Sequence, residues 1–157
     1  MLHCKAYRSI VDIPAKTWDG LFAGGNPFVS HAFLLALESS GCVGPDSGWH
    51  PRHMLLSDDH GAVAAMPLYR KDHSYGEFVF DWGWAEAFAR HGLEYYPKLV
   101  TAVPYSPVSG PRIGSARGFG HAPLYKALHR AIRDLSEAEH YSSWHLLFAD
   151  DRQCRAL

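Results

Sequence analysis

The sequence predicts one α/β domain, equally describable as α+β, in which helices flank a mixed, splayed β-sheet. Segments 52–57 and 62–70 have strand-forming compositions and are separated by a turn that contains Gly61. Residues 99–105 and 142–149 are two further predicted strands, and the stretch between them carries apolar residues at helical spacing. Because a helix of this length normally joins parallel neighbours, we expect these two strands to run parallel.

Length and composition favour a single globular domain over residues 1–157. Of the 157 residues, 47% are apolar and 20% are charged, and the formal net charge is −1. These values exclude a disordered, collagen-like or coiled-coil protein, and they argue against a polybasic binder of DNA or membranes. The three cysteines lie far apart, so neither a disulfide scaffold nor a cysteine zinc site is predicted.

The two ends of the chain predict its location and extent. Residues 1–8 lack the apolar core of a secretory leader, and no stretch approaches roughly 18 uninterrupted apolar residues. We therefore expect a cytoplasmic protein without a membrane span. Residues 150–157 open a helix that stops after about two turns without a C-cap. This predicts the N-terminal half of a longer two-half protein, truncated at residue 157.

Short elements are predicted in the first third of the chain. Residues 2–8 form an expected opening strand, and Pro14 suits the first turn of a helix that ends near Phe22. Ser30 is a good N-cap for a second helix, for which Gly41 provides the stop.

The middle of the chain is dominated by aromatic residues. Residues 77–82 are expected to continue the sheet, and residues 84–91 are expected to form a helix. Asp81 is interpreted as the cap of that helix, with positioning of an amine as the alternative. The aromatic run predicts one face of a strand in the core rather than a stacking platform for bases. It comprises Tyr75, Phe78, Phe80, Trp82 and Trp84.

In the last third, a helix is expected to begin at Pro123, which suits the first helical position, N1. The strand before it is interrupted by Pro104 and Pro107, each of which removes a backbone donor. We therefore expect the sheet to splay there and to leave a crevice beside the loop at 106–120.

The strongest charge signal lies between Glu94 and Asp134, an interval with no acidic residue. It contains Lys98, Arg112, Arg117, Lys126, Arg130 and Arg133. These residues surround the glycine-rich loop 110–120 and the start of the next helix, where free amides and the helix dipole favour anions. The sequence thus predicts an anion site, with a merely solvated basic face as the alternative.

Within this loop, Arg117-Gly-Phe-Gly-His-Ala122 matches R-x-x-G-x-A, one form of the pyrophosphate-binding signature of GCN5-related N-acetyltransferases. The glycines let the main chain approach a diphosphate, and we expect Gly120 to need a positive φ. The predicted cofactor-binding residues are Arg112, Gly114, Arg117, Gly118, Gly120 and Ala122.

Four further segments resemble the FemAB-like "peptidoglycan biosynthesis/recognition" family of the GCN5-related N-acetyltransferase (GNAT) superfamily. They are Asn26-Pro-Phe-Val-Ser-His-Ala-Phe-Leu34, Met66-Pro-Leu-Tyr-Arg-Lys71, Phe80-Asp-Trp-Gly-Trp84 and Pro104-Tyr-Ser-Pro-Val-Ser-Gly-Pro-Arg112. The resemblance implies a GNAT-like fold, with a second half in the same chain. It implies acyl or aminoacyl transfer to a small-molecule or peptide amine, from acetyl-CoA or another acyl-CoA, or alternatively from aminoacyl-tRNA. The competing hypothesis is a non-catalytic module that recognises a peptidoglycan-like or nucleotide-linked ligand.

Two residues are candidates for the general base or proton relay of such a transfer. Tyr105 ends the strand that is expected to splay, and His145 lies on the following strand. The eleven histidines lack the spacing of a zinc motif, so no metal site is predicted.

Overall fold

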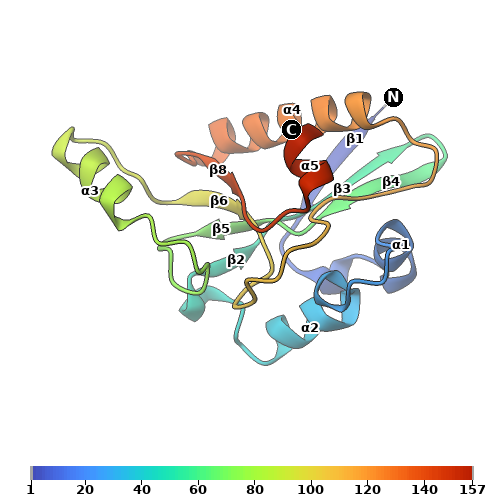
Figure 1. Ribbon diagram of the computed structural model, residues 1–157, viewed down its shortest axis with the longest axis horizontal. Helices are drawn as coiled ribbons and strands as arrows, with labels where there is room; N and C mark the ends of the chain where they lie inside the picture. The colour runs from blue at the N-terminus through green and yellow to red at the C-terminus, as the bar shows by residue number, and fades with distance from the viewer. Residues whose placement is uncertain (1, 157) are drawn as a thin grey trace.

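The structure, a computed structural model, describes residues 2–156 and has a mixed α+β architecture. Two four-stranded sheets lie between helices: α4 (His121–Glu139) runs along one side of them, and α1 (Ala15–Leu21) and α2 (His31–Ser39) lie on the other (Figure 1). This is the GNAT-like class of arrangement that the sequence predicts. No helix described between residues 2 and 156 combines the length and apolar composition that a bilayer crossing requires.

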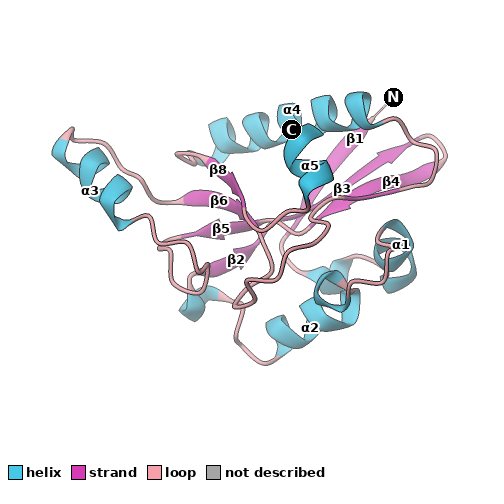
Figure 2. Ribbon diagram, in the orientation of Figure 1, coloured by secondary structure: helices cyan, strands magenta, loops and turns pink. Residues whose placement is uncertain are grey.

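The remaining elements complete the two sheets and their ends (Figure 2). The strands are β1 (His3–Tyr7), β2 (Trp49–Pro51), β3 (His53–Asp58), β4 (Gly61–Met66), β5 (Tyr69–Lys71), β6 (Lys98–Thr101), β7 (Gly114–Ser115) and β8 (Trp144–Leu146). The other helices are α3 (Trp82–Arg90) and α5 (Asp151–Ala156).

One long hairpin supplies strands to both sheets. The first sheet has the order β1-β3-β4-β7 and is antiparallel, and the second has the order β2-β5-β6-β8. The chain leaves one sheet and enters the other at Arg52 and at Leu68, where the Arg52 amide donates to the Leu68 carbonyl at 2.7 Å. The predicted hairpin and its turn before Gly61 are confirmed.

The parallel pair predicted in the last third is also confirmed. β6 and β8 run parallel, with Val100 opposite His145, and α4 connects them in the sequence. β6 ends at Thr101, earlier than expected, because Pro104 has no amide to donate and Tyr105 has a φ of 58°. β6 and β8 therefore diverge at the position that was predicted from Pro104 and Pro107.

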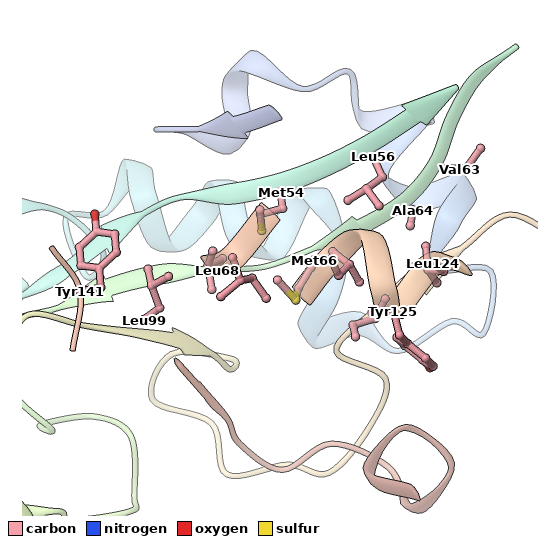
Figure 3. Packing of buried hydrophobic residues seen from close by; sticks show 13 residues of the cluster. Met54, Leu56, Val63, Ala64, Met66, Leu68, Leu99, Leu124, Tyr125 and Tyr141 are labelled. Atoms are coloured by element: carbon pink, nitrogen blue, oxygen red, sulfur yellow. The ribbon is translucent and has the colours of Figure 1, made fainter. Parts of the chain in front are cut away.

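Alternation along β3 divides the core into two layers. Met54 and Leu56 pack in the cluster that includes Leu124 and Leu128 of α4, whereas Leu55 packs in the cluster on the α1 and α2 side (Figure 3). The apolar stripe of α4 thus faces the sheet as predicted. Its N-cap is Gly120, so Pro123 is the third residue of the helix rather than the first.

Three other predicted helix boundaries agree with the structure. Pro14 precedes α1, and the Ser30 hydroxyl accepts a hydrogen bond from the Phe33 amide at the start of α2. Asp150 Oδ1 accepts from the Gln153 amide at the start of α5 at 2.8 Å. Leu157, the last residue of the predicted helix, lies outside the described residues.

The predictions for the aromatic run are wrong. Residues 77–82 form no strand, and α3 already begins at Trp82 and projects from the end of the second sheet (Figure 1). The aromatic side chains point to solvent, with Trp84 67% exposed, while Glu77 and Asp81 point inward. The reason is electrostatic, because the buried Lys98 binds both carboxylates of this segment.

Candidate functional site

Two lysines lie side by side in the interior at one end of the second sheet. Lys71 of β5 and Lys98 of β6 are register partners, and their residues are only 0% and 1% exposed. All four residues of β6 are buried, and in β5 Lys71 lies on the same buried face as Tyr69, so packing of the strands takes the lysines inside. A buried ammonium is unfavourable unless partners compensate it, and the arrangement of those partners therefore defines the site.

Lys98 is compensated by two carboxylates from one segment. Its Nζ donates to Glu77 Oε2 at 2.8 Å and also to Asp81 Oδ2. Asp81 further accepts hydrogen bonds of 2.7 Å each from the hydroxyls of Tyr95 and Tyr96. Burial would raise the pKa of the Asp81 carboxyl, but these donors lower it to about 2. Asp81 is therefore a firmly ionised group.

This finding corrects the role predicted for Asp81. It stands immediately before α3, but its side chain makes no capping hydrogen bond with that helix. The carboxylate instead holds an amine, as in the alternative interpretation, and the amine is that of Lys98 within the same chain.

Lys71 has much weaker compensation. Its Nζ donates to the Tyr75 carbonyl at 3.1 Å and lies 3.9 Å from the centre of the Trp49 ring. It makes no ion pair within 4.0 Å among the described residues. Burial, only partly opposed by Glu77, lowers the pKa of Lys71 to about 8. Near neutral pH, this amine is thus close to its own titration.

The two predicted catalytic residues flank this cluster of Lys71, Lys98, Glu77 and Asp81, hereafter the lysine cluster. His145 Nε2 lies 3.3 Å from the Tyr95 hydroxyl, which binds Asp81, and 2.9 Å from the Ser143 hydroxyl. Burial and the positive charge of Lys98 lower the pKa of His145, so its ring is neutral at neutral pH.

Tyr105 lies on the other side of the lysine cluster. Its ring centre is 5.9 Å from that of Trp49, which carries Lys71 on its face. Its amide donates to the Gly76 carbonyl at 3.1 Å, and its hydroxyl donates to the Cys42 carbonyl at 3.0 Å. Tyr105 is 42% exposed, so its ring is open to solvent beside the buried lysine.

Two of the predicted cofactor-binding residues have internal contacts. Arg112 is 0% exposed, and its guanidinium donates to the carbonyls of Leu147, Val108 and Gly110. Gly114 lies in β7, where a Cβ would approach the Leu21 carbonyl to 2.8 Å. The arginine fastens the loop to the end of β8, and the glycine is needed for packing against α1.

The other four predicted cofactor-binding residues lie together in the turn before α4. Arg117, Gly118, Gly120 and Ala122 are all exposed. The expectation of a positive φ at Gly120 is wrong, since its φ is −67°; Gly118 has the positive φ, of 80°. Among the described residues no side chain caps the start of α4, and its first turn holds no acidic residue, so the positive end of the helix dipole lies close to Arg117 in the chain without a negative side chain in that turn.

The basic interval does not form one surface. Lys98 and Arg112 are buried in separate internal networks, whereas the other four basic residues are exposed. Those four are Arg117, Lys126, Arg130 and Arg133. The charge signal in the sequence thus combined two buried structural cations with a smaller exposed set.

The crevice expected beside the loop is small. A cavity of about 230 Å³ lies between Gly114, Leu124 and Gln153, and its volume is below that of common ligand pockets. A larger groove of about 770 Å³ lies between β1 and α4, away from the lysine cluster. Among the described residues, no group of three or more His, Cys, Asp or Glu side chains is arranged to hold a metal ion.

Sequence reasoning did not predict the lysine cluster as a site. It assigned no site role to Lys71, Glu77 or the tyrosines Tyr95 and Tyr96 that bind Asp81, and it grouped Lys98 with the basic loop. A partial signal was present: Lys98 directly precedes the apolar residues Leu99 and Val100, and Glu77 and Asp81 lie within an aromatic run. Charges of both signs among apolar residues indicate a buried ionic network. Lys71 gives no such signal, because it follows Arg70 and precedes Asp72.

A sequence model of the FemAB-like family, described as peptidoglycan biosynthesis/recognition, matches residues 9–157. The chain belongs to this family. No curated protein and no solved structure shows significant similarity to it. The segments that resemble FemAB-like proteins meet at the lysine cluster: Met66–Lys71 contributes Lys71, Phe80–Trp84 contributes Asp81 and Pro104–Arg112 contributes Tyr105.

The remaining segment of the FemAB-like resemblance, Asn26–Leu34, contacts the segment Pro104–Arg112. Asn26 lies so close to Gly110 that a Cβ at that glycine would be 2.3 Å from Asn26 Nδ2. Gly110 in turn forms a parallel bridge with Ala149, three residues beyond the end of β8. The family segments therefore assemble around the end of the second sheet, on both sides of its splay.

Proposed function

We propose that this FemAB-like protein transfers an acyl or aminoacyl group to an amine of a peptidoglycan-related acceptor, with His145 as the general base. The observation that carries the proposal is the connected chain from His145 through Tyr95 and Asp81 to Lys98. A neutral, partly buried imidazole accepts a proton from the acceptor amine as it attacks, and the ionised Asp81, two hydrogen bonds away, favours the resulting positive charge.

The proposed reaction is direct attack in a ternary complex. The acceptor nitrogen forms a bond to the acyl carbon, and the bond from that carbon to the sulfur or oxygen of the donor breaks. The other ring nitrogen of His145 takes the proton that the acceptor nitrogen loses, because Nε2 already donates to the Tyr95 hydroxyl, and the leaving thiolate or alkoxide takes up this proton as it departs. Tyr105, exposed at the opposite side of the lysine cluster, is assigned to contact substrate or to relay this proton.

For the donor, the proposal uses the exposed turn before α4. Arg117 supplies a cation there, and the start of α4, whose first turn holds no acidic residue, supplies the positive end of a helix dipole. The anionic part is the diphosphate of an acyl-CoA or, in the alternative, the phosphates of an aminoacyl-tRNA.

Recognition without transfer is the second candidate function, and one observation favours it. Arg112 and Gly110 attach the chain's own loop to the end of β8, at the position where the splayed sheet was expected to open. A closed splay gives an acyl donor less room to approach between the strands, while the surface around Tyr105 stays accessible for a ligand.

A transfer assay separates these functions. Acetyl-CoA and aminoacyl-tRNA are offered separately as donors, with a peptidoglycan stem peptide that carries a free amine as acceptor. We expect transfer that His145→Gln lowers by about 10²–10⁴-fold. His60→Gln, in the exposed hairpin turn, is the matched control. Binding of the stem peptide without transfer from either donor supports recognition, and the absence of both contradicts both candidates.

A further inference from the structure

The segment 74–81, which covers the two lysines, has inverted polarity. Its carboxylates are inside, with Glu77 3% and Asp81 6% exposed, while Tyr75, Phe78 and Phe80 are 62%, 52% and 58% exposed. Globular proteins normally place these residue types the other way round. The segment therefore lies on the lysines through its charges rather than on the core through its aromatic rings.

Polar groups beneath this segment lack hydrogen-bond partners. Glu77 and Asp81 both bind Lys98, which leaves Lys71 with one backbone carbonyl as its hydrogen-bond acceptor. The indole N–H of Trp49, next to Lys71, is buried and has no hydrogen-bond partner. The Glu77 Oε1 atom is also buried without a partner. The two carboxylates thus satisfy the site incompletely.

The backbone of the segment is strained and has little regular structure. Gly76 has a φ of 80° and Phe78 a φ of 59°, a region that an aromatic residue rarely adopts. The contacts that hold it down involve the site itself: the Tyr75 carbonyl accepts from Lys71, and the Gly76 carbonyl accepts from the Tyr105 amide. Such strain persists where the surroundings impose it, and it occurs preferentially at ligand clamps and switches.

We propose that Lys71 and Lys98 form a binding site for a phosphate or diphosphate group of the substrate, which Glu77 and Asp81 fill in this structure and vacate when that group binds. Charge decides the ligand class. Two ammonium groups face two carboxylates, so departure of the carboxylates leaves a charge of +2 that a single carboxylate ligand does not balance. A phosphate monoester, with a charge of about −1.5 to −2 near pH 7, or a diphosphate restores neutrality.

The hydrogen-bonding capacity of the site agrees with this ligand class. A phosphate group offers several acceptor oxygens, which match the free N–H groups of Lys71 and the indole N–H of Trp49 as well as Lys98. The inference rests on the proposed function, because it assigns a phosphate-bearing substrate to the same site. Phosphate binding is measured without an acyl donor. A protein that binds phosphate but transfers no acyl group would therefore contradict the proposed function and leave the phosphate site supported.

The first test is calorimetric titration at fixed ionic strength. Inorganic pyrophosphate and glycerol phosphate are titrated separately, which distinguishes a diphosphate site from a monoester site. Glu77→Gln weakens the internal competitor, and we expect it to bind the preferred anion at least about tenfold more tightly than the unaltered protein, whereas Lys71→Met binds it about tenfold more weakly. Glu86→Gln makes the same charge change at a 67% exposed side chain of α3 and leaves the affinity unaltered.

A second variant separates this site from the turn before α4. Arg117→Ala combined with Glu77→Gln retains the gain in affinity if the ligand binds at the lysines. Equal affinities in the Glu77→Gln, Glu86→Gln and unaltered proteins would overturn the proposal, since a nonspecific basic surface responds to both substitutions alike.

Hydrogen exchange of the unaltered protein provides a measurement that does not depend on the folding of any variant. Pyrophosphate at saturating concentration is expected to increase deuterium uptake in residues 74–81 and at the Tyr105 amide, because the segment leaves the lysines. Unchanged or reduced uptake there, with pyrophosphate bound, shows that the carboxylates stay in place and contradicts the proposal.

Discussion

Gln153 Oε1 accepts a 2.7 Å hydrogen bond from the backbone amide of Arg112, which fastens α5 to the loop that follows β6. The same oxygen lies 3.2 Å from the Ile113 amide, and Gln153 Nε2 donates to the Ile113 carbonyl at 2.7 Å. One side chain thus satisfies three buried backbone groups of a segment that has little sheet pairing of its own.

We expect Gln153→Ala to lower the free energy of unfolding by about 2–4 kcal/mol, because it leaves those three groups without partners in a buried place. Urea denaturation followed by circular dichroism measures the change. Arg155→Ala, at an exposed position of the same helix, is the control and should stay within about 0.5 kcal/mol of the unaltered protein. A loss of the same size in both variants would point to general fraying of α5 instead.

Removal of the charge should cost much more stability at Lys98 than at Lys71. Lys98→Met leaves Glu77 and Asp81 as buried carboxylates without a counter-charge, so it should lower the free energy of unfolding by about 3–5 kcal/mol. Lys71→Met removes an ammonium that has no ion pair within 4.0 Å among residues 2–156, so it should cost less than about 1.5 kcal/mol. Urea unfolding at pH 7 compares the two, and equal losses would show that Lys71 also serves as a counter-charge.

Lys71 also predicts how stability changes with pH. The folded protein releases its proton near pH 8, whereas the unfolded chain holds it up to about pH 10.5. Between these values the unfolded state binds more protons, so the free energy of unfolding rises with pH, by at most about 1.4 kcal/mol per pH unit. The measurement is the stability of the unaltered protein minus that of Lys71→Met at several pH values. A difference that stays flat or falls from pH 8 to 10 would refute the assignment.

Sequence reasoning succeeded where one local rule decided the structure. Ser30 caps α2, a turn before Gly61 closes the hairpin, and the parallel pairing of β6 with β8 follows from the helix between them. Each of these features depends on nearby residues or on the general handedness of chain connections. Each was therefore available from spacing and residue type alone.

The site could be predicted only in part, because its side chains come from distant segments and charge reverses the usual rule of burial. The alternation around Asp81 indicates which residues share a face but not which face is inside. The lysines on β5 and β6 decide this, and their proximity follows from the sheet order. In the same way, the sequence suggests that Arg112 is a surface cation, although the structure buries it and its partners are backbone carbonyls.

The exposed turn before α4 gives a prediction that separates binding from folding. Arg117→Ala should weaken binding of an acyl-CoA about 10–100-fold, because it removes a charge-assisted contact to the diphosphate. The free energy of unfolding should not change, since Arg117 is exposed. Titration with CoA at two salt concentrations measures the effect, with Arg133→Ala as the control on the exposed side of α4. Equal losses in both variants would indicate a diffuse basic surface.

The pH dependence of transfer tests the role of His145 most directly. A general base acts in its neutral form, and burial together with Lys98 lowers the pKa of His145 from its ordinary 6.5. Activity should therefore persist as the pH falls to 6.5 and decline only below it, as the ring becomes protonated. Tyr95→Phe removes the hydroxyl between His145 and Asp81, so it should lower kcat more than it raises KM and should move this acid limb. An acid limb above pH 6.5, or one that Tyr95→Phe leaves in place while kcat is unchanged, would assign the proton transfer to another group.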